Sequence, residues 1–100
     1  MIIEYKHLKI DTESAAAYLI GYRLPLTPSE FKILEILSQS VVSSGKGMTT
    51  AELINRYTDR PLMSSNVTVH VCSINKKARA IGARKLITYS YGRYYLNEYM

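Results

Sequence analysis

The segment SSNVTVHVCSINKKARAIGARKLITYSYGRYYL, residues 64–96, joins two different residue patterns. In its first part the apolar residues recur at spacings of four, three, four and three, the pattern of an amphipathic helix; they are Val67, Val71, Ile74, Ala78 and Ile81. Gly82 follows and is suited to end that helix. In the last part, 86–96, β-branched and aromatic residues flank a turn that contains glycine, which predicts a β-hairpin. We therefore expect a helix over residues 64–82 followed by a hairpin.

The polar face of the expected helix is basic and contains no acidic residue. Its outward residues are small in the first half and basic in the second: Ser65, Val69, Cys72, Ser73, Lys76, Arg79 and Ala80, flanked by Asn66, His70 and Lys77. A helix that only faces solvent usually interleaves glutamate with lysine, because such pairs stabilise it. The missing acids favour a surface for a negatively charged partner over a solvated face or a surface for another protein.

The charges of the whole chain are unevenly distributed. Its 100 residues carry 13 Lys or Arg and 8 Asp or Glu, a net charge of +5. Residues 60–97 hold seven basic residues and no acid, whereas residues 1–59 hold six basic residues and seven acids. A long acid-free segment points to a polyanionic partner, with nucleic acid ahead of anionic lipid. A membrane is not an expected partner, because the core needs the apolar stripe of the helix.

Two capping boxes predict two further helices upstream. Thr27 is followed by Glu30, with a proline between them at the first helical position, and apolar residues then recur at helical spacing as far as Val41. Thr49 and Glu52 form the second box and open a short helix. The glycine-containing segment 43–47 between the two helices is expected to be a loop.

The first 26 residues predict an antiparallel sheet. Residues 4–11 and 16–26 have the composition of strands, and the polar residues 11–14 supply a turn between them. Gly21 leaves open a second turn, followed by a third short strand over 22–26.

The expected order of sheet, three helices and hairpin is that of an α+β fold, a winged helix-turn-helix with an N-terminal antiparallel sheet. The length fits one domain, which we divide into the sheet (1–26), a three-helix core (27–82) and the hairpin wing (86–97). Without a secretory signal, a long apolar segment or more than one cysteine, the chain is expected in the cytoplasm.

No group of residues predicts catalysis or a metal site. His70 and Cys72 are two residues apart on the expected helix and therefore diverge, and only His7 could join them. The glycines at 44–47 lack the remaining residues of a phosphate-binding loop. We expect neither an enzyme, a cofactor, a metal ion nor a small-molecule substrate.

Four motifs resemble the DNA-binding effector domain of OmpR/PhoB-type response regulators. They are LKID (8–11), LPLTPSEFKIL (24–34), VTVHV (67–71) and GRYYL (92–96), and the resemblance extends from about residue 5 to residue 96. It implies a transcriptional regulator that binds double-stranded DNA, with the third helix in the major groove and the wing at the minor groove.

The resemblance and the helix face together give the candidate DNA-contacting residues, which are Ser65, Asn66, Val69, His70, Ser73, Lys76, Lys77, Arg79, Thr88, Arg93 and Tyr94. Asn66 could read adenine and Val69 could pack on a thymine methyl group. Arg93 is expected at the tip of the hairpin, where it would enter a narrow minor groove. The four basic residues Lys76, Lys77, Arg79 and Arg93 are expected to form one basic ridge that binds phosphates.

The chain also departs from the pattern of that family. Cys72, Ser73 and Asn75 stand where the family usually has arginines, and Ser65 and Ser90 replace two more. Strong bidentate reading of guanine is therefore not expected, because it needs the donors of arginine or lysine. We expect modest, salt-sensitive binding that depends more on DNA shape than on bases.

Partners other than DNA stay open at this point. By the same resemblance, residues Asp59–Ser64 are a candidate contact for RNA polymerase, and a homodimer is conceivable. The chain begins directly with the sheet, without the receiver domain that family members carry, so we expect control by abundance, a partner chain or dimerisation unless the sequence is a fragment. The competing function is a winged-helix module for protein contacts, which the missing arginines and the nine tyrosines would fit.

Overall fold

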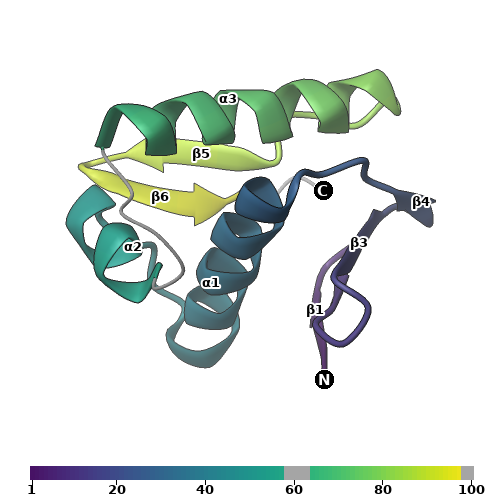
Figure 1. The fold of residues 1–100 in the computed structure, drawn as a ribbon, viewed down its shortest axis with the longest axis horizontal. Coiled ribbons are helices and arrows are strands. Elements are labelled where there is room, and N and C mark those ends of the chain that lie inside the picture. Colours follow the sequence, from purple (N-terminus) through teal and green to yellow (C-terminus); the bar gives the residue numbers. More distant parts are fainter. Residues whose placement is uncertain (58–63, 98–100) are drawn as a thin grey trace.

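The computed structural model describes residues 1–57 and 64–97, and it confirms the predicted winged-helix order (Figure 1). The N-terminal sheet consists of β1 (Ile2–Tyr5), β2 (Leu8–Asp11), β3 (Ala16–Leu19) and β4 (Tyr22–Arg23). Three helices follow, namely α1 (Pro28–Ser44), α2 (Thr50–Arg56) and α3 (Ser64–Ala80). The hairpin is formed by β5 (Ile87–Ser90) and β6 (Arg93–Leu96).

The N-terminal sheet has one more turn than the sequence predicted. Its strands pair antiparallel in the order β1-β2-β3-β4. The single strand predicted over 4–11 is wrong, because Lys6 adopts a positive φ of 55° and the chain turns there into β2. The turn after Asp11 is confirmed, and its carboxylate accepts a hydrogen bond from the N–H of Glu13 at 3.1 Å. The second turn is confirmed at Gly21 with a φ of 81°, but the strand after it has only two residues.

Both capping boxes are present at the starts of α1 and α2. In α1 the hydroxyl of Thr27 accepts from the N–H of Glu30 at 3.3 Å, and the carboxylate of Glu30 accepts from the N–H of Thr27 at 3.0 Å. In α2 the corresponding distances between Thr49 and Glu52 are 3.1 and 2.9 Å. These reciprocal bonds satisfy N–H groups that a helix start leaves without partners. At its other end α1 continues to Ser44, into the segment expected as a loop.

One hydrophobic core joins the sheet, the helices and the hairpin. The predicted stripe of α3 is confirmed, since Val67, Val71, Ile74 and Ala78 are buried and Ile81 packs against the core. The other elements contribute buried residues to the same cluster: Leu8, Ile10 and Leu19 from the sheet, Ile33, Leu34 and Leu37 from α1, and Leu86, Ile87 and Leu96 from the hairpin region. Figure 1 shows α1 between the N-terminal sheet and the unit formed by α3 and the hairpin. This packing leaves the opposite face of α3 open to solvent.

The hairpin is held to the loop before α2. The N–H of Met48 donates to the carbonyl of Tyr94 at 3.0 Å, and the N–H of Tyr94 donates to the carbonyl of Met48 at 2.7 Å. The preceding residue, Gly47, leaves no room for a side chain: a Cβ placed there would lie 2.8 Å from the ring of Tyr95 and closer still to the carbonyl oxygen of Tyr94. The loop and β6 can approach this closely only because residue 47 is a glycine.

We expect Gly47→Ala to lower the free energy of unfolding by about 1–3 kcal/mol, the usual effect of inserting a methyl group where no space exists. Urea unfolding monitored by circular dichroism measures this difference. Lys46→Ala is the control, because the neighbouring lysine side chain is exposed. Equal stability of Gly47→Ala and the wild type would contradict the close packing of the loop on the hairpin.

Candidate nucleic-acid interface

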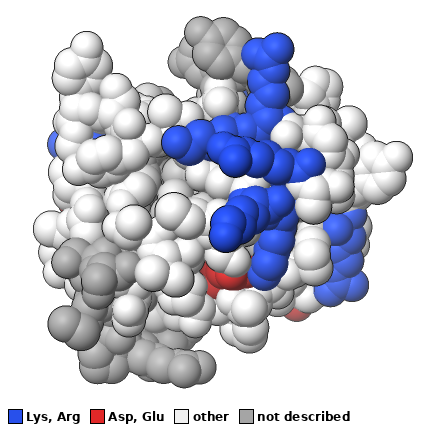
Figure 2. Space-filling model, turned by 90° about the horizontal axis from the view of Figure 1, so that it is seen from above, with Lys and Arg blue, Asp and Glu red and all other residues white. Residues whose placement is uncertain are grey.

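The outer face of α3 is open along its whole described length. Val69 is 65% exposed, and Asn66, Cys72, Lys76 and Arg79 are also exposed. His70 and Ser73 are partly buried at the borders of this face. Figure 2 looks down on this side of the molecule and shows Lys and Arg side chains gathered on the half where the C-terminal turns of α3 lie, with little acidic surface beside them. The predicted division into a small N-terminal half and a basic C-terminal half is therefore present.

Lys77 is not a free cation on this face. Its Nζ donates a hydrogen bond to the carboxylate of Glu30, which also closes the capping box of α1 and is only 4% exposed. Burial raises the pKa of Glu30, but hydrogen bonds from Lys77, Ser73 and the N–H of Thr27 outweigh it, so the pKa lies below its usual value. Lys77 thus ties α3 to the first turn of α1, and most of its charge is already neutralised locally.

Arg93 does not extend from the tip of the hairpin, and this part of the prediction is wrong. It is the first residue of β6, and its guanidinium donates to the carbonyl of Gly47 at 2.8 Å and pairs with Glu52 at 3.1 Å. The tip is formed by Tyr91, which is 100% exposed, and Gly92. The expected ridge of four basic residues is therefore not formed, because Arg93 holds the hairpin to the start of α2.

The candidate Tyr94 and the residue Asn75 lie inside the fold. Tyr94 is 6% exposed, its backbone pairs with Met48, and its ring lies 4.7 Å from that of Tyr89. Asn75, which the resemblance placed at an arginine position, is buried and bonds to the backbone of Ile87. Neither side chain is therefore placed to contact DNA from the outer face of α3.

The remaining candidates lie on the wing or outside the described residues. Thr88 is partly buried on β5. The side chain of Ser65 and residues 59–63, which include most of the predicted polymerase contact, lie outside the described residues. Tyr89 and Tyr91 are exposed on the hairpin but were not among the predicted site residues, although the alternation along β5 and the position of the turn indicate their exposure.

The described part of the chain contains no group of metal-binding side chains and no membrane-spanning helix. Among residues 1–57 and 64–97, no three His, Cys, Asp or Glu side chains lie close enough together to hold a metal ion. Across the same residues, no helix combines the length and the apolar composition needed to cross a bilayer.

The fold is that of the winged-helix domains of OmpR/PhoB-type response regulators, as the sequence motifs predicted. The DNA-binding domain of the response regulator AdeR, solved in complex with an intercistronic region, is 27% identical, with a TM-score of 0.78 over 95% of this chain and 97% of that one. The RstA DNA-binding domain of Klebsiella pneumoniae, solved with the RstA box, is 20% identical, with a TM-score of 0.74 over 95% of each chain.

A longer regulator has the same fold in one part of its chain. The OmpR/PhoB homologue DrrB of Thermotoga maritima is 24% identical, with a TM-score of 0.71, and the present chain covers 44% of its length. No protein-family model matches the chain, and no curated protein matches its sequence. The likeness is therefore one of structure.

Proposed function

We propose that this protein is a transcriptional regulator that binds double-stranded DNA, with α3 in the major groove and the hairpin at the minor groove. The observation that carries the proposal is the open outer face of α3, on which Lys76 and Arg79 lie without a paired acid among the described residues. The winged-helix domain of AdeR, whose structure contains DNA, supports the same assignment.

The two halves of α3 have different proposed roles. The small residues of the first half allow a close approach to base edges, where Asn66 would pair with adenine and Val69 would contact a thymine methyl group. Lys76 and Arg79 would bind backbone phosphates, which raises affinity without carrying sequence information. At the wing, Tyr91 is the side chain placed to reach the minor groove, since Arg93 is bonded to Gly47 and Glu52.

Titration of an A·T-rich duplex by fluorescence anisotropy, at about 50 and about 200 mM salt, tests the proposal. We expect the affinity to fall with salt, and the double variant Lys76→Gln/Arg79→Gln to reduce the slope of log K against log salt concentration by about two, one unit per lost phosphate contact. Lys77→Gln should change the slope less, because Glu30 already binds Lys77.

The matched control is the double variant Lys9→Gln/Lys46→Gln, which removes the same charge from exposed positions outside α3. If it lowers the slope as much as the α3 variant, net charge and not the helix face explains binding. A salt-independent affinity would contradict the proposal directly.

A module for protein contacts is the second candidate function. The exposed side chains of Val69, Tyr89 and Tyr91 favour it, because aromatic and apolar residues often anchor protein interfaces. A folded protein that binds no duplex at the lower salt concentration would favour this function over DNA binding. Contacts with RNA polymerase and formation of a homodimer stay predictions, and the first of them concerns a segment outside the described residues.

A further inference from the structure

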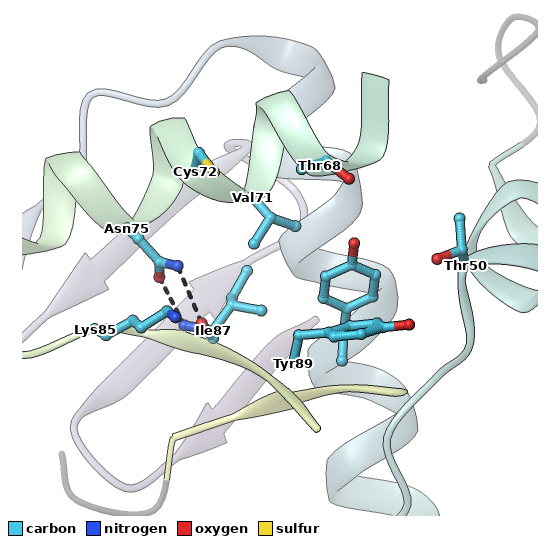
Figure 3. Close-up of a pocket in the computed structure, with 9 residues that line it drawn as sticks. Thr50, Thr68, Val71, Cys72, Asn75, Lys85, Ile87 and Tyr89 are labelled. Atoms are coloured by element: carbon cyan, nitrogen blue, oxygen red, sulfur yellow. Dashed lines mark hydrogen bonds between the residues drawn. The ribbon is translucent and has the colours of Figure 1, made fainter. Parts of the chain in front are cut away.

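A pocket of about 530 Å³ lies between α3 and the hairpin, with α2 at its side (Figure 3). Figure 3 shows Thr68, Val71 and Cys72 along α3 above it, Tyr89 on the hairpin below, and Thr50 across from Tyr89 on α2. Its volume is in the range of sites that hold small organic molecules. The pocket is lined by core residues such as Val71 and by Cys72, which is exposed on α3.

A polar bridge lies at one end of the pocket, next to Lys85. The side-chain amide of Asn75 donates to the carbonyl of Ile87 at 3.0 Å and accepts from its N–H at 2.8 Å, as the dashed lines in Figure 3 show. These two bonds occupy the backbone groups that Ile87 presents on the outer edge of β5. A long strand therefore cannot pair along this edge, which limits an occupant to the remaining part of the pocket.

The next outward position of β5 is open. Tyr89 is opposite Tyr94, whose N–H and carbonyl both bond to Met48 on the far side of β6. Opposed residues in an antiparallel pair either exchange both of their hydrogen bonds or none, so Tyr89 and Tyr94 exchange none. The N–H and carbonyl of Tyr89 thus point toward α3, and no described residue bonds to them.

The pocket walls define the chemistry of an occupant. Val71 and the rings of Tyr89 and Tyr94 are apolar or aromatic surfaces, which favour a flat ring that stacks or packs edge-on. Lys85 also lines the pocket, is exposed, and forms no ion pair with any described residue. Its ammonium group favours an anionic substituent on that ring.

We propose that the pocket between α3 and the hairpin binds a small aromatic anion, with the ring between Val71 and Tyr89 and the anionic group on Lys85. An occupant would contact Cys72 and Thr68 on the side of α3 that faces the hairpin. If α3 reads DNA as proposed above, the bound anion would also place negative charge beside α3 and lower the affinity for DNA. Binding of the anion itself does not depend on that function.

The test is a titration of the ¹⁵N-labelled protein, without DNA, with 2-naphthoate and with its neutral analogue 2-naphthalenemethanol. We expect both compounds to shift the amide signals of Tyr89 and Cys72. Lys85→Gln should weaken the binding of naphthoate about fivefold, as expected for loss of one exposed ion pair, and leave that of the alcohol unchanged. Lys46→Gln, at an exposed lysine outside the pocket, is the control and should change neither.

A second variant tests the location. Cys72→Phe would fill the pocket from an exposed helix position and should abolish binding of both compounds, with thermal unfolding to show that the fold is kept. The absence of shifts at the pocket residues, or an equal loss of naphthoate binding in Lys46→Gln, would overturn the proposal.

The DNA titration repeated in the presence of naphthoate should show a lower affinity of the protein for the duplex. If no duplex binds at all, the proposed function fails while the naphthoate result still decides on the pocket.

Discussion

Replacing Glu30 by alanine is expected to lower the free energy of unfolding by about 2–4 kcal/mol, because one buried carboxylate serves two helices. It accepts hydrogen bonds from the N–H of Thr27 at the start of α1 and from the ammonium group of Lys77 on α3. The alanine variant leaves that N–H without its partner and Lys77, which is partly buried, without its counter-ion. Urea unfolding gives the loss in stability, and the duplex titration should show weaker binding because α3 loses its tie to α1.

The chain contains its own control for this experiment. Glu52 closes the capping box of α2 with the same two hydrogen bonds, but its side chain is exposed and its other partner, Arg93, is a surface residue. Glu52→Ala should therefore cause a clearly smaller loss of stability than Glu30→Ala. Equal losses would show that the contact with Lys77 adds nothing beyond the cap.

The contribution that the charge of Glu30 makes to stability can be separated from that of its hydrogen bonds by varying the pH. Glu30→Gln retains a side-chain oxygen that can accept from Thr27 but cannot ionise. Because the pKa of Glu30 is lowered below 4.5 in the folded state, its charge stabilises the fold fully above that value, and the gain is lost as the pH falls through the folded pKa. The difference in stability between wild type and Glu30→Gln, measured from about pH 2 to pH 7, should follow this course. A difference in stability that does not change with pH would contradict a lowered pKa of Glu30 in the folded protein.

Local sequence signals predicted the helices and the hairpin well. Both capping boxes and the apolar stripe of α3 depend on residues three or four positions apart, so the sequence alone contains them. The turn within residues 4–11 was missed because it depends on a positive φ at Lys6, a residue type that gives no signal for it. Turns of this kind are set by the pairing of the strands that they join.

The charged part of the candidate site could be predicted only in part. Lys76 and Arg79 face outward because helical periodicity requires it, and the structure agrees. Lys77 and Arg93 instead meet Glu30 and Glu52, which lie 47 and 41 residues away in the chain. Counting charges within a segment treats each basic side chain as unpaired. In the fold, however, two acids from residues 1–59 pair with Lys77 and Arg93. The pocket beside Lys85 likewise depends on the spacing between α3 and the hairpin.

Asn75→Leu is expected to destabilise the protein by about 2–4 kcal/mol, even though leucine has a similar volume. The amide of Asn75 satisfies the N–H and the carbonyl of Ile87, and a leucine would leave both without partners in a buried position. The control is Asn66→Leu on the exposed face of the same helix, where the change should stay within about 0.5 kcal/mol. Both differences are measured by urea unfolding.

Asn75→Asp separates the two hydrogen bonds of this amide. The carboxylate can still accept from the N–H of Ile87, but its second oxygen faces the carbonyl of Ile87 at the position where the amide donated. Burial and this repulsion raise the pKa of the introduced acid, so protonation favours the folded state, because a protonated carboxyl can donate to the carbonyl. The stability of Asn75→Asp relative to wild type should therefore recover as the pH falls toward about 4. A variant that stays equally destabilised across this range would show that the bond to the carbonyl does not hold α3 on β5.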